Sequence, residues 1–286
     1  MSSKWEAVEI NSLQIYAGGF MYPNIDLHFI QIPIYTVLFL VAFAVAIVIA
    51  RHIAPGYGIP KEDVLYASCY GAIGLFIGAK IMYFVSKLPI IVTRFDVYIA
   101  YFKKDFMGAL NFSFGGLVFY GGLIGAVVGV YIYCRQYKVP FYPFLDIFAP
   151  LIPFVHGFGR IGCFFAGCCY GKEYHGFGSV QFRHNDLIPE LDDVPRVPVQ
   201  LIEAGLNFIL CIILFVVMKK VKTKTGQMMG IYVLSYLVIR ICTECLRGDS
   251  VRGGIGVLST SQIVSLILIP IGIVLVRGKY IERKKG

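Results

Sequence analysis

The sequence predicts an all-α protein built into a membrane, and three observations lead to this fold class. Hydrophobic residues make up 57% of the 286 residues and charged residues only 15%, whereas soluble domains average about 45–50% and about 25%. Several apolar runs approach the roughly 20 residues that a helix needs to cross a bilayer. The net charge of +9 lies between these runs, which favours anionic lipid as the partner and speaks against nucleic acid.

Seven apolar segments predict seven transmembrane helices in a single membrane domain over residues 1–286. The first, IPIYTVLFLVAFAVAIVIA, stops at Arg51; the third contains FGGLVFYGGLIGAVVGVYIY; the last is followed by the basic tail RGKYIERKKG. Residues 1–30 show no cleavable signal peptide pattern, because acidic residues interrupt them. The predicted spans are 32–50, 64–86, 112–134, 142–162, 198–218, 227–246 and 257–276.

Basic residues in the loops predict the orientation of these helices. If the amino terminus is outside, the run KKVKTK and the basic tail both lie on the cytoplasmic side. We therefore expect a multi-pass protein of the cytoplasmic membrane with a cytoplasmic carboxyl terminus. The segments at about 87–111 and 164–197 would then be extracytoplasmic.

Ionisable residues inside the apolar segments are costly, and each is a functional candidate by default. His156 and Arg160 are four residues apart, as are Arg240 and Glu244, so each pair shares a helix face. Forked guanidinium donors match phosphate oxygens, which predicts a phosphate site. An internal salt-bridge network is the alternative. The ionisable residues concerned are Lys80, His156, Arg160, Glu203, Arg240, Glu244 and Arg247.

Two of the predicted helices contain several glycines, which make part of the helix surface narrow. Small residues let membrane helices approach closely, and this explains most of them. Gly121 and Gly122 beside Tyr120 have a second interpretation, which is room for a lipid head group.

Five of the eight cysteines lie near the outer helix ends. Cys163, Cys168 and Cys169 occur in GCFFAGCCYG, and Cys242 and Cys245 form C-x-x-C. A disulfide or redox pair is favoured if the outside is oxidising. Plain packing, a reactive thiol beside Arg160 and a zinc site remain as alternatives. The spacing C-x₄-C-C is not a standard zinc pattern, so neither a metal nor another cofactor is expected.

Several motifs, in order, resemble those of the bacterial prolipoprotein diacylglyceryl transferases. HGFGRIGCFFAGCCYG is similar to G-R-I-G-N-F-x-N-G-E-x-x-G, and FYGGLIGA to F-H-G-G-L-x-G. VPVQLIEA resembles H-P-S-Q-L-Y-E, and YLVIRICTECLR resembles Y-x-x-x-R-x-x-x-E-x-x-R. GLFIGAKIMYF and LSTSQIVSL resemble two further segments of the family. The resemblance covers nearly the whole chain and includes the seven-helix count.

The resemblance implies an activity. The family transfers the diacylglyceryl group of phosphatidylglycerol to the thiol of a cysteine in a prolipoprotein signal peptide and releases glycerol 1-phosphate. Arg160 and Arg240 match its essential arginines and would bind the phosphate, with Glu244 orienting Arg240. The further functional or supporting positions that match are Tyr35, Glu203, Tyr236, Glu244 and Arg247.

Departures from the family motifs fall on the polar partners of these arginines. Tyr120 replaces the histidine of H-G-G-L, Cys163 and Cys168 replace an asparagine and a glutamate, and Val197 and Lys80 replace a histidine and an arginine. Tyrosine is a poor base near neutral pH, so His156 is a substitute candidate for the base. Three hypotheses follow: this transferase with a diverged site, a related lipid head-group transferase with another acceptor, or a membrane thiol redox or metal-binding protein.

Overall fold

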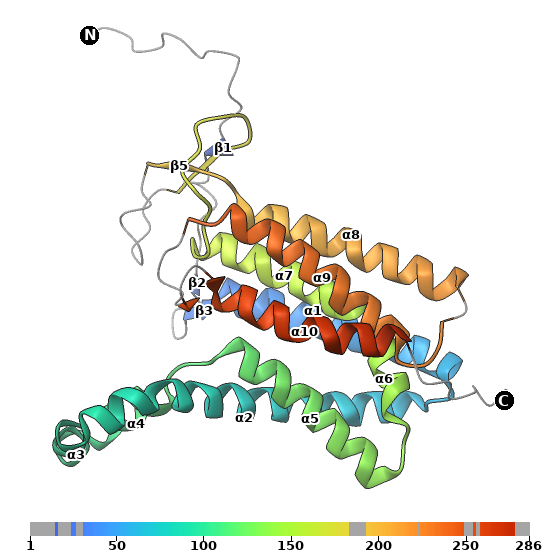
Figure 1. The fold of residues 1–286 in the computed structure, drawn as a ribbon, viewed down its shortest axis with the longest axis horizontal. Helices are drawn as coiled ribbons and strands as arrows, with labels where there is room; N and C mark the ends of the chain where they lie inside the picture. Colours follow the sequence, from blue (N-terminus) through green and yellow to red (C-terminus); the bar gives the residue numbers. More distant parts are fainter. Residues whose placement is uncertain are drawn as a thin grey trace, which may run out of the picture. The chain divides into compact units, whose positions relative to one another are not determined.

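The computed structural model of the chain describes residues 15–16, 24–26, 31–182, 193–221, 223–248, 254–255 and 258–277 (Figure 1). Helix dominates this part of the chain, which confirms the predicted all-helical class. The helices are α1 (Ile34–Ile53), the 3₁₀ turn η2 (Ala54–Tyr57), α2 (Lys61–Thr93), α3 (Phe95–Lys104), α4 (Phe106–Phe114), α5 (Phe119–Tyr137), α6 (Phe141–Phe148), α7 (Leu151–Phe165), α8 (Val199–Lys220), α9 (Gln227–Cys245) and α10 (Thr260–Arg277).

The described ranges also contain seven short strands. β1 pairs in parallel with β4, and β4 pairs antiparallel with β5. The antiparallel pairs β2–β3 and β6–β7 stand by themselves. The strands are β1 (Ile15–Tyr16), β2 (Asn24–Asp26), β3 (Gln31–Pro33), β4 (Val180–Gln181), β5 (Pro195–Arg196), β6 (Gly254–Ile255) and β7 (Leu258–Ser259).

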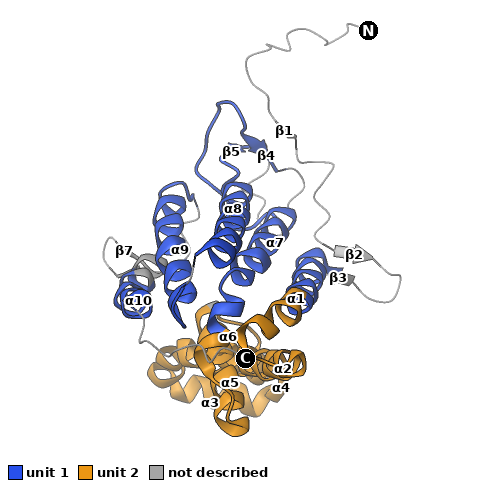
Figure 2. Cartoon of the chain, turned by 90° about the vertical axis from the view of Figure 1, so that its right-hand side faces the viewer, with its two compact units in different colours: residues 1–48, 145–285 blue, residues 49–144, 286 orange. Residues whose placement is uncertain are grey.

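The chain divides into two compact units (Figure 2). Unit 1 comprises residues 1–48 and 145–285, and unit 2 comprises residues 49–144 and 286. Each unit is described by itself below.

Glycines determine how the long helices of unit 2 pack. A Cβ added at Gly74 of α2 would overlap the carbonyl oxygen of Gly125 on α5, and one at Gly78 would overlap that of Gly121. The two backbones therefore touch, as small residues allow in membrane proteins. The packing interpretation of Gly121 is confirmed, while its role in binding a lipid head group stays a prediction.

The segment predicted as an extracytoplasmic loop at 87–111 is helical. α2 continues through Pro89 to Thr93, seven residues beyond the predicted end of the second span, and α3 and α4 follow directly. The Asp105 side chain accepts a hydrogen bond from the Gly108 backbone N–H over 2.8 Å and begins α4. The third span, predicted from residue 112, begins only at Phe119, because α4 ends at Phe114 and Gly115 and Gly116 follow it.

Unit 1 contains α7, α8 and α9 packed in sequence order, with α10 against α9. A buried apolar cluster at Ala149, Leu214 and Met228 fills the space between the inner faces of α8 and α9. The buried carboxylate of Asp146 accepts hydrogen bonds from the backbone N–H groups of Gly226 and Met228, at 2.7 and 3.0 Å. It thereby caps the beginning of α9.

The fourth predicted span, 142–162, is not one straight helix. α6 and α7 meet at an angle of 44°, with Pro150 directly before α7. A proline inside a helix lacks the N–H that would bond to the preceding turn, so a bend is expected there.

Four helices in the described ranges are long and apolar enough to span a membrane: α1 together with η2, α2, α8 and α9. The bent pair α6–α7 makes a fifth candidate if it is one span. The third and seventh predicted spans coincide with α5 and α10, and their crossing of a membrane stays a prediction.

Candidate active site

A single buried carboxylate connects two arginines in unit 1. Arg160 on α7 donates to Glu203 Oε1 from Nη2 over 2.8 Å. Arg240 on α9 donates to Glu203 Oε2 from Nη1 over 3.4 Å. Glu203 comes from α8, has no exposed surface and stands between the other two helices. The structure thus brings together the two arginines that the sequence singled out.

A second carboxylate fixes the other side of Arg240. Its Nη2 lies 2.6 Å from Glu244 Oε2, one turn along α9. Arg247, on the turn after α9, is also buried. Among the described residues, two guanidinium groups and two carboxylates therefore form one connected network. The salt-bridge network that the sequence left as an alternative is present, and the forked donors of its arginines suit an anionic ligand.

The Arg160 side chain has one N–H group that could donate a hydrogen bond to a ligand. Its Nε is buried and makes no hydrogen bond within the described part of the chain. Leaving a buried donor of a charged group unsatisfied is costly. An anion that reached Nε would remove this cost, so the arginine is suited to bind one.

His156 and Tyr236 border the same carboxylate. His156 lies one turn before Arg160, with Nε2 3.8 Å from Glu203 Oε1. Its ring is 5.2 Å from that of Tyr236 on α9, measured between centroids. Both residues were site candidates from the sequence, and the structure places them beside the two arginines.

Tyr35 joins this region from α1. Its backbone and ring pack on Gly162 of α7, where a Cβ would come within 2.8 Å of the Tyr35 ring. Tyr35 also interacts electrostatically with Arg160 and Cys163. The glycine therefore lets α1 approach the helix that carries Arg160.

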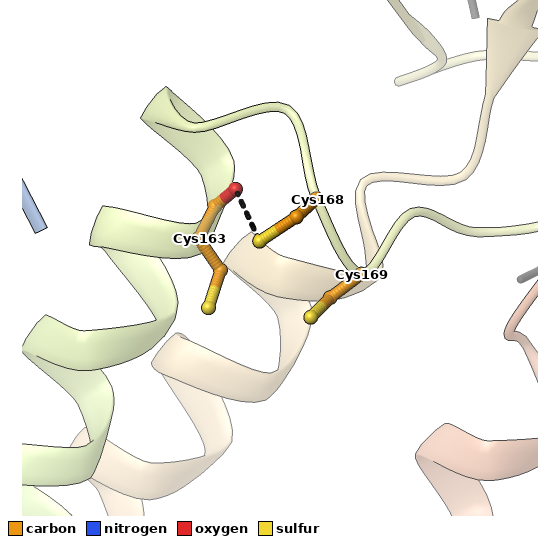
Figure 3. A group of neighbouring side chains, drawn as sticks. All are labelled: Cys163, Cys168 and Cys169. Carbon is orange, nitrogen blue, oxygen red and sulfur yellow. Dashed lines mark hydrogen bonds between the residues drawn. The ribbon is translucent and has the colours of Figure 1, made fainter. Parts of the chain in front are cut away.

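Three cysteines, here called the thiol cluster, converge at the carboxyl end of α7 (Figure 3): Cys163, in the last turn of the helix, and Cys168 and Cys169, which follow it. Their three Sγ atoms lie within 4.8 Å of one another. Cys168 Sγ also contacts the carbonyl oxygen of Cys163 at 3.7 Å. Hydrogen bonds with the two neighbouring thiols, together with burial, raise the pKa of Cys168 above that of an ordinary cysteine.

The cysteines depart from the sequence interpretation in two ways. All eight lie in described segments, and no disulfide joins any of them. Cys242 and Cys245 are exposed on α9 and do not belong to the thiol cluster. Of the five cysteines near the predicted outer helix ends, three therefore converge.

Two buried amides were missed by the sequence analysis. Gln200 of α8 donates from Nε2 to the carbonyl oxygen of Cys168 over 2.7 Å. Asn207 donates from Nδ2 to the Glu203 carbonyl oxygen over 2.8 Å. Gln200 could have been found, because it is the glutamine of the motif VPVQLIEA. For Asn207 the only signal was its position four residues after Glu203, which puts both on one helix face.

The polypeptide after the thiol cluster is tied to the end of α9. Lys172 N–H donates to the Leu246 carbonyl oxygen over 3.0 Å, and Gly248 N–H donates to that of Tyr170 over 3.1 Å. Gly171 and Arg247 form an antiparallel bridge. Arg247 is thus held by its backbone, in the same unit as the two arginines.

Four sequence candidates belong to unit 2. Lys80 of α2 donates to the carbonyl oxygen of Phe114 and lies 5.5 Å from the Phe76 ring centroid. Tyr120, Gly121 and Gly122 lie in the first turn of α5, where both glycines face α2. Their roles in the site stay predictions.

Comparison with known proteins agrees with the motifs that surround this site. The family model described as "Prolipoprotein diacylglyceryl transferase" matches residues 24–277. A phosphatidylglycerol–prolipoprotein diacylglyceryl transferase of Clostridium tetani is 34% identical over 76% of this chain and 80% of its own length. A second such enzyme, from Clostridium perfringens, is 32% identical over 97% and 96%. The chain belongs to the prolipoprotein diacylglyceryl transferase family.

Proposed function

We propose that this protein transfers the diacylglyceryl group of phosphatidylglycerol to the cysteine thiol of a prolipoprotein signal peptide and releases glycerol 1-phosphate. The observation that carries the proposal is the pair of buried arginines around Glu203. Family membership supplies the substrates, since the relatives are named for phosphatidylglycerol and prolipoprotein.

The chemistry requires the features seen around Glu203. The acceptor sulfur attacks a glyceryl carbon, the carbon–oxygen bond to the phosphate breaks, and glycerol 1-phosphate leaves with the electron pair. Cations placed before the reaction at the phosphate stabilise the charge that develops there. Arg160 and Arg240 fill this role, and Glu203 and Glu244 hold their guanidinium planes. Arg247 adds positive charge at the end of α9.

The thiol proton must also leave, and two side chains are candidates for accepting it. Tyr120 stands where the family has histidine, and His156 lies 3.8 Å from Glu203. Lys80, Gly121, Gly122, Tyr35 and Tyr236 are proposed to contact the lipid.

The proposed reaction takes place in the bacterial cytoplasmic membrane. We place all seven apolar helices across the bilayer in one domain, with the amino terminus outside and the carboxyl terminus in the cytoplasm. Arg160 and Arg240 then lie toward the outer side, and the segment at 164–197 is available to hold the signal peptide.

A transfer assay with purified protein, phosphatidylglycerol and a lipobox peptide tests the proposal. Release of glycerol phosphate should occur with the unmodified protein and stop in Arg240→Ala, with Arg135→Ala on the exposed end of α5 as the matched control. If the unmodified protein leaves the peptide thiol unmodified, the proposal is wrong.

One observation favours a second candidate function. The thiol cluster would serve a membrane thiol redox or metal-binding protein on the same scaffold. In that case Cys163, Cys168 and Cys169 are essential to a reaction that needs neither phosphatidylglycerol nor the peptide. A different acceptor remains a variant of the transferase proposal, and it predicts glycerol phosphate release with other thiols or alcohols.

A further inference from the structure

The thiol cluster has the dimensions of a metal site. Zinc–sulfur bonds are about 2.3 Å long, which separates thiolates in a tetrahedral site by about 3.8 Å. The three Sγ atoms already lie within 4.8 Å of one another. Rotation about the side-chain bonds would have to shorten these separations by about 1 Å at most. A redox pair would need only two of these sulfurs.

The backbone after α7 turns so that the three thiols face one point. Gly167 has φ +64° and Cys169 has φ +61°. A non-glycine residue rarely adopts such an angle, and surrounding contacts must hold it there. Cys168 N–H donates to the Cys163 carbonyl oxygen over 3.1 Å, and buried Gln200 holds the Cys168 carbonyl oxygen. The turn is therefore built into the fold.

We propose that Cys163, Cys168 and Cys169 bind one zinc ion as thiolates, and that the thiol of the acceptor peptide occupies the fourth position. Three protein ligands with one open position are typical of catalytic zinc sites. This inference rests on the proposed transferase function and names the group that activates its acceptor.

The proposed transfer needs no protein base to remove the proton of the acceptor thiol. The acceptor R–SH binds zinc, the S–H bond breaks and the proton goes to solvent, because a coordinated thiol is deprotonated. The thiolate sulfur then forms a bond to the glyceryl carbon, and the phosphate oxygen leaves with the electrons of the broken carbon–oxygen bond. The transfer needs no oxidant or reductant. The role of the family's absent histidine at position 120 is thereby filled.

The proposed zinc ion lies beside the proposed phosphate site, because Arg160 is close to the thiol cluster. Arg160 precedes Cys163 by three residues, so both lie on the same face of α7. Arg160 also interacts electrostatically with Cys163 and Cys169. A zinc ion with three thiolates has one net negative charge, which the neighbouring Arg160 guanidinium attracts. The acceptor sulfur and the phosphate would thus meet at the end of one helix.

The sequence analysis expected no metal because C-x₄-C-C is not a standard spacing. Spacing alone does not decide ligand geometry, and the turn at Gly167 returns Cys168 and Cys169 toward Cys163. The convergence of sulfurs is visible only in three dimensions.

The first experiment measures zinc bound to the purified full-length protein in detergent, with a phosphine reductant present. We expect about one zinc per chain. The triple variant Cys163→Ser, Cys168→Ser, Cys169→Ser should hold none, whereas the matched double variant Cys242→Ser, Cys245→Ser should hold as much as the unmodified protein. A zinc-free unmodified protein after incubation with zinc, or equal zinc in the triple variant, overturns the proposal.

The second experiment replaces zinc with cobalt and follows the sulfur-to-cobalt absorption. A lipobox peptide should change the spectrum, and the same peptide with serine for its cysteine should not. An unchanged spectrum with the thiol peptide rules out the acceptor as fourth ligand. Arg240→Ala should keep both the zinc and the spectral change while losing transfer.

This design separates the two proposals. If the unmodified protein binds zinc and its cobalt spectrum responds to the thiol peptide, but no glycerol phosphate appears, the transferase proposal fails while the zinc site stands. If transfer occurs at the same rate in the triple variant, the transferase stands and the catalytic role of zinc fails. Gln200→Ala should lower zinc affinity by about 10–100-fold, as loss of an outer-shell partner does.

Discussion

The two units solve the packing of membrane helices by opposite means. In unit 2, α2 and α5 meet through glycines, and their backbones touch at Gly74, Gly78 and Gly125. In unit 1, α7, α8 and α9 are joined by charged side chains that meet on Glu203. The first interface is made by close backbone contact and the second by buried ion pairs.

The difference between the two interfaces shows which helix contacts need an explanation beyond stability. Glycine contacts leave no charge to satisfy, so they are an inexpensive way to join two helices. Buried ion pairs contribute little net stability once desolvation is counted. The charges of unit 1 therefore need a reason beyond packing, and the proposed phosphate site supplies one.

Glu203→Gln should have the largest effect on stability. Two buried arginines lose their shared carboxylate, and breaking a buried pair costs about 3–5 kcal/mol. Denaturant unfolding in detergent measures the loss, and Glu203→Asp should recover part of it. Glu173→Gln, whose side chain is exposed, should change the free energy of unfolding by less than about 0.5 kcal/mol. Equal effects at the two positions would contradict the role assigned to the ion pairs.

Arg240→Lys should lower the transfer rate by about 10²–10³-fold, the usual cost of removing one group that stabilises developing charge. A lysine has one ammonium group and cannot reach Glu203, Glu244 and a phosphate together. The measurement is glycerol phosphate release, with Arg135→Lys as the control. A rate within about twofold of the unmodified protein would show that Arg240 acts only as a positive charge.

Gly125→Ala should destabilise unit 2 by about 1–3 kcal/mol, the usual cost of overpacking. The new methyl group would overlap the Gly74 carbonyl oxygen and push α5 away from α2. Gly205→Ala on α8 is the matched control, because nothing lies within 4 Å of that position; there alanine should be neutral or stabilising. Thermal unfolding of both variants provides the comparison, and similar melting temperatures would exclude the close packing.

Lys80→Met should change the free energy of unfolding by less than about 1 kcal/mol, since it removes one hydrogen bond to the Phe114 carbonyl oxygen. If Lys80 contacts the lipid as proposed, KM for phosphatidylglycerol should rise while kcat changes less. Unchanged KM would restrict the phosphate contacts to the arginines of unit 1.

The sequence predicted the helical class well, and it singled out the charged residues of the candidate site, because both depend on local patterns. Apolar runs and i,i+4 spacing are read directly from residues such as Arg240 and Glu244. Helix ends were less accurate: α2 runs past residue 86, and the fourth span is bent at Pro150. These differences arise from packing and from proline, which hydropathy does not record.

The parts of the site that could not be predicted depend on distant contacts. No local pattern states that Glu203 is shared between Arg160 and Arg240, since the three residues belong to different helices. The convergence of Cys168 and Cys169 on Cys163 requires the turn at Gly167. Gln200 matched a family motif, but its partner, the Cys168 carbonyl oxygen, is a backbone atom.

The shared carboxylate of Glu203 also has a consequence for biosynthesis. Arg160 is made 43 residues before Glu203, whereas Arg240 follows it by 37 residues. A ribosome adding about 5–20 residues per second needs about 2–7 s to reach Arg240. During that interval the nascent chain contains only the first half of the ion-pair network. The network around Glu203 is therefore completed only when α9, the last of its three helices, has been made.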